Sequence, residues 1–590
     1  MILQSLVQLY EDLVDQGKID RPGWGPVKVS FALRIDADGN LVALEDLRQT
    51  SDNGKKTAMV PQTMSLPEQV KRSSGVCSNF LCDNAAYMLG MDVKSKPNDE
   101  AGVKEKNMKR ARECFGACRK LHHQLLDGFD DPFAKAILLF FENWKAEGAA
   151  AHPLIQAYTD ELHSANIIFQ MDLIYAQQVP SIRRVWDERK ETGNDGSEVR
   201  RCLVTGENAA IARLHPSIKG VMDANSTGAS LISFNAPAFE SYGHDGQQGL
   251  NAPVGEYAAF AYGTALNYLL ADRGHTFHLG DSTIVFWAEH ADEANTDFFS
   301  ALIGNGNEVK DDEILSALRS LSQGKPVAWN NHVLSPDNRF YILAVSPNSA
   351  RLSVRFFLQS SLGELALNVF AHQQRMEIVR PSFDTVELLP LYAMLRETVN
   401  PNSTNKNASP LLAGEVLRSV LTDSLYPESL FSQTEMRIRA ENEIKRGKAA
   451  IIKAYLLKNQ STTHPIYKEV ATVNLNEETT YTPYVLGRLF SVLEAIQDAA
   501  NPGINTTIRD RYFNSACCTP AVVFPQLIRL SQNHLKKIGG GLAVHYQQQL
   551  GHLMGMLHEV YPARLSLPDQ GVFQLGYYHQ TQKRYEKASV

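Results

Sequence analysis

A polar segment at residues 396–410 divides the chain into two parts with different sequence patterns. The segment reads RETVNPNSTNKNASP and has no large apolar side chain except Val399. Such a composition is typical of a linker, because it offers almost nothing to a hydrophobic core. Beyond it, apolar residues recur mostly at helical spacing, with breaks at proline and glycine. We therefore expect a C-terminal helical bundle at residues 411–590.

The part before the linker mixes the spacing of helices with that of strands. Residues 2–14 carry apolar side chains at intervals of three and four, which predicts an amphipathic helix. Residues 27–36 and 41–48 read as strands on either side of an Asp38-Gly39 turn, and residues 339–357 read as a second hairpin around Ser346-Pro347-Asn348. These patterns predict an α+β fold, with a mixed N-terminal and central body before the helical bundle.

Composition also suggests how the chain divides into domains. Residues 202–287 are rich in Gly, Ser, Asn and Pro, with one clear helix near residues 256–270, which favours long ordered loops resting on strands. At roughly 150 residues per domain, a chain of 590 residues holds several domains. The expected order is an N-terminal α+β region at 1–200, a central α+β region with long polar loops at 201–395, the linker at 396–410 and the helical domain at 411–590.

Cysteine usage and apolar runs bear on where the protein works. Seven cysteines are an odd number, which fits a reducing compartment. The N-terminus is interrupted by acidic residues where a secretory signal would be apolar. The longest apolar run, residues 137–141, is far shorter than the about 20 residues that a membrane span needs. We expect a soluble, cytoplasmic protein that does not enter a membrane.

Common catalytic motifs are absent from the sequence. It contains no G-x-x-x-x-G-K-[ST] phosphate loop, no H-E-x-x-H and no G-x-S-x-G. His244-Asp245 is a pair that some metal-dependent hydrolases use, but one pair is a weak signal. Four cysteines could in principle bind zinc, although their spacing favours buried thiols instead; they are Cys77, Cys82, Cys114 and Cys118. We expect no catalytic activity, no metal and no cofactor.

The charges are spread unevenly. A net charge of −7 opposes a protein that coats nucleic acid over its whole surface, yet binding depends on local charge. Residues 55–120 contain 13 Lys and Arg against 7 Asp and Glu, whereas residues 281–313 contain nine acidic residues and one Lys. Doublets of cations suit a phosphate backbone, because each neutralised phosphate releases a counterion. For any single doublet, a solvated helix face is the alternative.

The run from Lys71 to Gly90 combines positive charge with small polar residues. Serine hydroxyls and a glycine backbone can approach a phosphate, and asparagine can read base edges. The candidate residues for contact with duplex DNA are Lys71, Arg72, Ser73, Ser74, Asn79 and Asn84. The alternative is a structural loop in which Asn79 and Asn84 bond to local backbone at the start of a helix.

Further polar and basic residues lie outside this run. The loop at residues 234–254 is long for a connector, and long ordered loops are often functional, although a structural Ω-loop is the alternative. Its candidate residues are Asn235, Gln247 and Asn251. The candidates for contacts with a DNA or RNA backbone are Lys55, Lys56, Lys109, Arg110, Arg112, Lys445, Arg446, Lys448, Arg509, Arg511, Lys536 and Lys537. Residues 437–458, read as one amphipathic helix, and residues 505–537 could form grooves for single strands or face a partner protein.

Four stretches together resemble one known family. They are MILQSLVQLYEDL at the N-terminus, the run from Lys71 to Gly90, the block from Cys202 to Glu289, and FYILAVSPNSARLSVRFF. The chain resembles the large subunit of type I-C CRISPR surveillance complexes, also called Cascade. The resemblance covers nearly the full length and weakens after the linker, where AAIIKAYL and LGRLFSVLEAIQ still carry it.

The resemblance implies an RNA-guided DNA-binding subunit without catalysis of its own. Such a subunit lies near the 5′ end of the CRISPR RNA, reads the protospacer-adjacent motif (PAM) in double-stranded DNA and promotes duplex opening and R-loop formation. It also holds the displaced non-target strand and recruits the helicase–nuclease that degrades the target in antiviral defence. Its other partners would be the backbone, RNA-processing and small subunits of this ribonucleoprotein complex. Base pairing supplies the long sequence specificity, while protein reads a short motif and backbone shape.

The C-terminal part is similar to the small subunit of such complexes. The resemblance implies that this part can also be made separately, from an internal start between about Met436 and Val492. Two other functions stay open on the residues alone. One is a metal-dependent nuclease or hydrolase that uses His244-Asp245, and the other is a pure protein scaffold whose cations dock other subunits.

Overall fold

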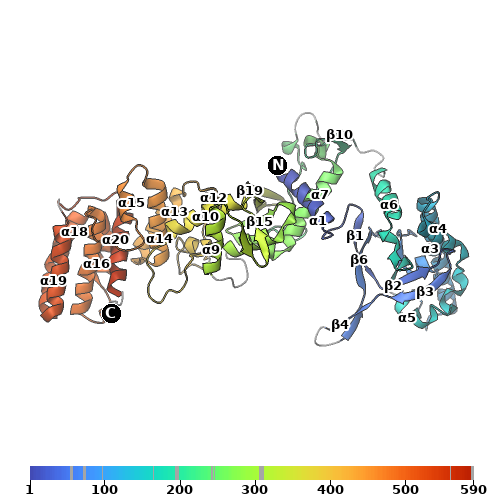
Figure 1. Ribbon diagram of the computed structural model, residues 1–590, viewed down its shortest axis with the longest axis horizontal. Coiled ribbons are helices and arrows are strands. Elements are labelled where there is room, and N and C mark those ends of the chain that lie inside the picture. The colour runs from blue at the N-terminus through green and yellow to red at the C-terminus, as the bar shows by residue number, and fades with distance from the viewer. Residues whose placement is uncertain are drawn as a thin grey trace. The chain divides into compact units, whose positions relative to one another are not determined.

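The computed structural model of the chain describes residues 1–52, 57–70, 75–95, 98–163, 165–192, 198–240, 244, 246–303, 311–404, 406–557 and 560–585. It confirms the α+β class: sheets and helices alternate up to Ser361, and in the described residues beyond it the regular elements are helices (Figure 1). The chain divides into two compact units, Met1–Pro216 with Ser233–Ala265, and Ser217–Ile232 with Leu266–Val590. None of the described helices has both the length and the apolar character that a membrane crossing needs.

The first unit contains most of the N-terminal strands and helices. Its strands are β1 (Trp24–Val29), β2 (Phe31–Ile35), β3 (Leu41–Asp46), β4 (Gln49–Asp52), β5 (Thr57–Val60), β6 (Gln62–Pro67), β7 (Cys82–Asn84), β8 (Asn166–Met171), β9 (Ile174–Tyr175), β10 (Val199–Arg201) and β11 (Asn208–Ala210). Its helices are α1 (Ile2–Asp15), α2 (Ala85–Met88), α3 (Ala101–Leu126), α4 (Pro132–Asn143), α5 (Thr159–Leu162) and α6 (Pro180–Thr192), and α7 (Glu256–Ala271) begins in it. The predicted N-terminal helix and the predicted helix near residues 256–270 are both confirmed.

A small sheet carries the core of this unit. Its strand order is β3-β2-β8-β7, with β9 paired to β8, and β2 runs parallel to β8. The β2–β3 hairpin confirms the predicted turn, where Gly39 has a φ of 76° and a Cβ would lie 2.4 Å from the backbone nitrogen of Phe140. Only glycine fits such a turn without strain. The rings of Phe140, Phe141 and Phe169 pack between the sheet and α4, with centroids 5.4–5.6 Å apart.

A two-stranded ribbon also belongs to the first unit. Strands β1 and β6 pair antiparallel, from Trp24 opposite Pro67 to Val29 opposite Gln62. Strand β5 leads into β6 across Pro61 and pairs with β4. The apolar side chains that the ribbon buries include Val27, Met64 and Leu66, which pack in a small cluster with Ile168 of β8. The ribbon is therefore tied to the sheet through side-chain packing.

The second unit begins with a mixed sheet and continues in helices. Its strands are β12 (Ser217–Ile218), β13 (Ala229–Ser230), β14 (Thr276–Leu279), β15 (Ser282–Ala288), β16 (Val327–Trp329), β17 (His332–Leu334), β18 (Arg339–Asn348) and β19 (Arg351–Ser361). Its helices are α8 (Glu293–Leu302), α9 (Asp311–Ser322), α10 (Leu362–Met376), α11 (Leu391–Arg396), α12 (Pro410–Thr422), α13 (Glu428–Glu441), α14 (Arg446–Tyr455), α15 (Ile466–Val470), α16 (Thr482–Ala500), α17 (Ile508–Cys518), α18 (Pro520–Ile538), α19 (Gly540–Gly555) and α20 (Leu567–Tyr585). A π-helical turn, Leu456–Gln460, follows α14.

The predicted hairpin at residues 339–357 is present as β18 and β19. The sheet has the order β12-β13-β19-β18-β15-β14. The strands reverse direction at Ser349 and Ala350, because Asn348 still pairs with Arg351 and Ser349 has a φ of 57°. Pro347, which the sequence placed in the turn, lies inside β18 opposite Leu352. The turn therefore lies slightly later than the position of the proline indicated.

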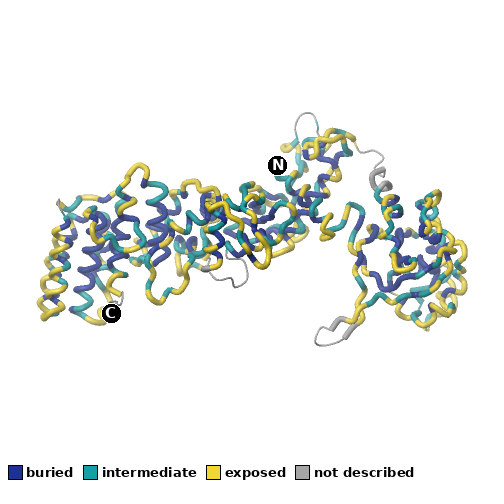
Figure 2. The backbone as a smooth tube through the Cα atoms, in the orientation of Figure 1, coloured by how far each residue is buried: buried dark blue, intermediate teal, exposed yellow. Residues whose placement is uncertain are grey.

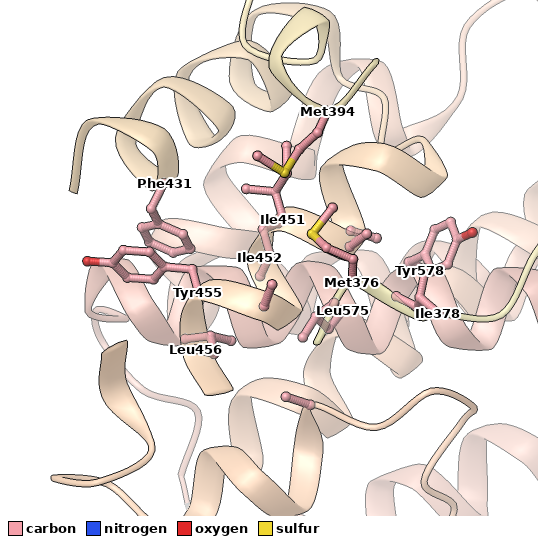
Figure 3. Close-up of a cluster of buried hydrophobic side chains, with 14 of the residues drawn as sticks. Met376, Ile378, Met394, Phe431, Ile451, Ile452, Tyr455, Leu456, Leu575 and Tyr578 are labelled. Carbon is pink, nitrogen blue, oxygen red and sulfur yellow. The ribbon is translucent and has the colours of Figure 1, made fainter. Parts of the chain in front are cut away.

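The helices of the second unit share a continuous apolar core. Met376, Ile451, Leu456 and Leu575 come from different elements and point into it (Figure 3). Helices α16 and α20 are buried along most of their length (Figure 2). They approach closely because Gly487 faces α20, where a Cβ would lie 1.9 Å from the carbonyl oxygen of Phe573. The close approach therefore requires glycine at this position, because any other residue would place a Cβ against α20.

The structure shows what surrounds the segment predicted to be a linker, and it divides the predicted basic helix in two. Residues on both sides of the segment 396–410, such as Leu395 and Leu412, belong to the same core cluster, and the second unit continues through it. The two units also follow other bounds than the predicted regions. The expectation of one amphipathic helix at residues 437–458 is wrong: α13 ends at Glu441, its C-cap Asn442 adopts a left-handed conformation, and α14 begins only at Arg446.

Candidate functional site

The side chain of Asn79 is built into the fold beside the predicted basic run. It is 5% exposed, and its carbonyl oxygen accepts a hydrogen bond from the backbone of Val70 at 2.8 Å. Its amide nitrogen donates to Oε1 of Gln69 at 2.5 Å, and its backbone nitrogen donates to Asp83 at 2.9 Å. Asn79 thus joins the end of the β6 segment to the start of β7.

A buried histidine holds the next part of this segment. His122 on α3 accepts a hydrogen bond from the backbone nitrogen of Leu81 at 3.1 Å, and its Nδ1 lies 2.8 Å from the carbonyl oxygen of Cys118. Leu81 has a φ of 63°, a conformation that costs an L-residue free energy. It persists only where surrounding contacts hold the backbone in place. Burial lowers the pKa of His122 to about 4, so the ring is neutral and can accept this bond. No sequence pattern singles out His122, because the residues around it show only the spacing of a helix face.

Asn84 and Arg110 line one cavity between α2 and α3. The Asn84 side chain caps α2 by accepting from the backbone of Ala86 at 3.0 Å, the local bonding that the sequence offered as the alternative. Arg110 donates from Nη2 to the carbonyl oxygen of Gly75 at 2.6 Å. The cavity measures about 270 Å³, and Asp92 and Asn107 contribute to its wall.

These contacts hold both ends of a short basic segment. Val70 is fixed by Asn79, and Gly75 is fixed by Arg110. Lys71, Arg72, Ser73 and Ser74 lie between these ends and fall outside the described residues. Lys55, Lys56 and Asp245 also fall outside them. On α3, Lys109 and Arg112 are exposed beside Arg110, and Nε of Arg112 lies 3.9 Å from Glu147.

The polar loop at residues 234–254 holds its own side chains together. Nδ1 of His244 lies 2.8 Å from Oε1 of Gln247, and Asn251 donates to the carbonyl oxygens of His244 at 3.2 Å and Gln248 at 3.0 Å. Asn235 and Gln247 are exposed, whereas Asn251 is half-buried. Within the described part of the chain, no group of three or more His, Cys, Asp or Glu could hold a metal ion.

The candidate cations at the start of α14 divide into two kinds. Arg446 is 9% exposed and donates to Asp384 at 3.0 Å and to the carbonyl oxygens of Val386 and Glu387 at 2.6 and 2.7 Å. Lys448 is 2% exposed and forms an ion pair with Glu441. Lys445, one residue before Arg446, is exposed. Arg446 and Lys448 therefore serve the packing of this unit, and a nucleic-acid surface does not rest on them.

The candidate cations near the C-terminus follow the same division. Nε of Arg509 lies 3.7 Å from Glu494, a carboxylate that also accepts from the hydroxyl of Tyr577 at 2.5 Å. Lys537 donates to Oδ1 of Asn501 at 2.6 Å but is exposed. Arg511 and Lys536 are exposed as well.

Three of the four cysteines considered for zinc are buried. They are Cys82, Cys114 and Cys118, as the interpretation as small apolar residues predicts, whereas Cys77 is exposed. Burial raises the pKa of the Cys82 thiol, which keeps it neutral. Sγ of Cys118 lies 3.6 Å from Nδ1 of His122, so this thiol belongs to the core around the histidine.

The chain also matches a known protein family. The model of a family described as CRISPR-associated protein (Cas_Csd1) matches residues 6–585. The match therefore includes both compact units. A search among curated proteins gave no match.

Proposed function

The chain belongs to the Cas_Csd1 family of CRISPR-associated proteins, and from this premise we propose that it is the large subunit of a type I-C RNA-guided surveillance complex. In this role it recognises the PAM in double-stranded DNA, promotes duplex opening and R-loop formation, and holds the non-target strand. It recruits a helicase–nuclease and has no catalytic activity itself. Its binding partners are the CRISPR RNA, the target DNA and the other subunits of the complex, and it works in the cytoplasm.

The observation that carries the DNA-binding part is that Val70 and Gly75, the residues on either side of a basic segment in the first unit, are hydrogen-bonded to the fold. Asn79 fixes its entry through Val70, and Arg110 fixes its exit through Gly75. Two cations and two hydroxyl groups lie in the four residues between these ends, a composition that suits phosphate and base edges. A site is more precise when rigid elements hold its supports, and α3 supplies one of them here. Asn79 thus acts by positioning the segment rather than by touching DNA.

The exposed cations on α3 extend this surface. Lys109 and Arg112 face solvent beside the residue that fixes Gly75. Cations that contact phosphates give affinity without sequence information, while a few contacts to base edges supply the choice of motif. We assign the first task to α3 and the second to residues 71–74, with Asn235 and Gln247 as further polar groups available to a duplex.

The test compares a motif-containing duplex with the same target already opened as a bubble. The double variant Lys71→Ala, Arg72→Ala should bind the duplex about tenfold or more weakly, since each lost base or phosphate contact costs roughly 1–3 kcal/mol. It should bind the bubble almost as well as the original chain, because motif reading is not needed there. The complex is assembled with its CRISPR RNA, and binding is measured by mobility shift or fluorescence anisotropy.

A matched control carries the same loss of charge elsewhere. Arg319→Ala, Lys325→Ala removes two exposed cations of the second unit and should leave both affinities unchanged. Equal losses on duplex and bubble in the Lys71, Arg72 variant would refute motif reading by this segment. DNA cleavage by the purified chain with divalent metal, lost in His244→Ala, would refute the non-catalytic role and favour the hydrolase alternative.

A further inference from the structure

A cavity lies at the base of the β1–β6 ribbon in the first unit. It measures about 410 Å³, within the range of roughly 300–1,000 Å³ typical of small-molecule pockets. Its walls come from β1, β6, the turn after β9 and the start of α6, and they are formed by Trp24, Gln62, Met64, Ser65, Tyr175, Gln177, Gln178 and Arg183. None of these lining residues is acidic. The combination is aromatic rings, amides and one cation.

The Trp24 wall is fixed from two sides. Its indole nitrogen donates to Oδ1 of Asp187 at 2.7 Å, which sets the plane of the ring. The guanidinium of Arg183 lies over the ring, 5.3 Å from its centroid. A cation held over an indole in this way is attracted by the ring and stays close to the cavity wall. Trp24 and Arg183 are therefore placed before any ligand arrives.

Gln177 has an unsatisfied amide in this cavity. Its Oε1 is buried and has no hydrogen-bond partner among the described residues. Its Nε2 lies 3.9 Å from Sδ of Met64, and a thioether is a weak acceptor. If the amide were turned over, the nitrogen would lack a partner instead, so one polar atom is unpaired in either orientation. A buried polar atom without a partner is costly, and here it belongs to a residue that lines the cavity.

We propose that this cavity binds one unstacked nucleobase of single-stranded nucleic acid. Glutamine amides carry a donor and an acceptor side by side, which is the pattern that pairs with the edge of a base such as adenine. Tyr175 offers aromatic surface for stacking, and Arg183, which lies over the buried Trp24 ring, supplies a cation for the neighbouring phosphate or a guanidinium plane for the base itself. Among the described residues that line the cavity there is no carboxylate, which favours such a ligand over a cationic peptide.

This inference rests on the proposed function, because an unstacked base arises where a duplex is opened. Strand β6 forms one wall of the cavity and ends at Pro67, three residues before Val70. Val70 is the residue that Asn79 holds at the entry of the basic segment. A base released beside that segment would therefore reach the cavity along β6.

The test uses the full chain and a 12-nucleotide single-stranded DNA of thymidines with one central 2-aminopurine. The fluorescence of 2-aminopurine falls when the base stacks on an aromatic ring, so binding in the cavity should quench it. In Gln177→Leu the affinity should fall about tenfold. The thermal stability should stay equal or rise, because the unsatisfied amide is removed. Tyr175→Leu should lose the quenching. Gln156→Leu, the same change on the exposed surface of this unit, is the control and should change nothing.

The outcomes separate the cavity from the proposed function. If the chain binds motif-containing duplex but shows no quenching and no effect of Gln177→Leu, the cavity inference is wrong and the proposed function stands. If Gln177→Leu lowers thermal stability and leaves binding unchanged, Gln177 is structural and the inference also fails. If Tyr175→Leu keeps the quenching but loses a partner subunit during purification, the cavity takes a protein segment instead. If no nucleic acid binds at all, the proposed function itself fails.

Discussion

Two clusters of positive charge, on α3 of the first unit and on α14 of the second, have the same sequence signature and different surroundings. On α3, Lys109 and Arg112 are exposed, Arg112 lies 3.9 Å from the exposed carboxylate of Glu147, and Arg110 donates to the carbonyl oxygen of Gly75. On α14, Arg446 and Lys448 are buried and paired with carboxylates. Burial of a charge is tolerated only with such partners, so the second cluster is structural. Positive charge in a sequence therefore identifies a binding surface only after its partners are known.

The largest effect is expected from Arg446→Ala. The change removes a buried guanidinium together with its bonds to half-buried Asp384 and to two backbone carbonyl oxygens. We expect the region around α14 to lose roughly 3–5 kcal/mol of stability, because three hydrogen bonds from a charged group are lost at about 1–1.5 kcal/mol each. Hydrogen exchange of the α14 amides, read by mass spectrometry, measures this loss.

Its matched control is the neighbouring residue. Lys445 is exposed, so Lys445→Ala should change the opening free energy derived from the same exchange rates by less than about 0.5 kcal/mol. If the two variants behave alike, the division between structural and solvent-facing cations on α14 is wrong. The two substitutions remove one cation each, one residue apart, so the difference isolates burial.

The sequence predicted the local parts of the fold and missed the contacts between distant residues. The helix at Ile2–Asp15, the Asp38-Gly39 turn and the β18–β19 hairpin follow from spacing within a few residues. The carboxylate that Arg446 meets, Asp384, is 62 residues away in the chain, and no periodic pattern encodes that pairing. Charge counts alone therefore grouped Arg446 with exposed cations such as Lys445.

The polar segment at residues 396–410 illustrates a second limit. Among the described residues between α11, which ends at Arg396, and α12, which begins at Pro410, there is no helix or strand. Composition cannot show whether the elements on either side share a core, because that depends on Leu395 and Leu412 meeting the same cluster. A polar stretch inside one compact unit and a polar linker between two units look the same in sequence.

For the candidate site, the residue types of the sequence point to a segment, but they do not reveal the contacts of its side chains. The run from Lys71 to Gly90 was recognised by its polar and basic residues. Asn79 was predicted to face DNA, but its bonds to Val70 and Gln69 depend on a folded loop that residue types do not reveal. His122 and Gln177 gave no signal, because one buried histidine or one glutamine is common on any chain. The sequence shows which chemical groups are present, but it does not show which atoms contact one another.

The next effect in size is a loss of stability at acidic pH around Leu81, whose backbone nitrogen donates to His122. Burial lowers the pKa of His122 from 6.5 to about 4. Between these pH values the ring is therefore protonated in the unfolded chain and neutral in the folded chain. Stability from this residue is complete above about pH 6.5 and is lost as pH falls toward 4, by about 3 kcal/mol in total. Exchange of the Leu81 amide, corrected for the intrinsic pH dependence, should show this opening.

Two histidine variants separate the cause from general acid unfolding. His122→Phe should remove the pH dependence at Leu81, at the cost of lower stability at neutral pH. His123→Gln changes the adjacent, half-buried ring, which lies 3.2 Å from Asp127, and should keep the acid response. An acid response that persists in His122→Phe would show that another group controls this segment.

The smallest effect on folding is expected on α3, where the effect on binding should be clear. Lys109→Gln with Arg112→Gln removes two exposed charges, so the thermal stability should change by less than about 0.5 kcal/mol. If both cations contact phosphates, the slope of log affinity against log salt should fall by nearly two, because each contact releases about one counterion. Titrations of duplex DNA at several salt concentrations measure that slope, with Arg319→Ala, Lys325→Ala as the charge-matched control. An unchanged slope together with unchanged stability would mean that α3 faces a partner subunit. The contrast between the two clusters would then be one between a protein interface and a buried core.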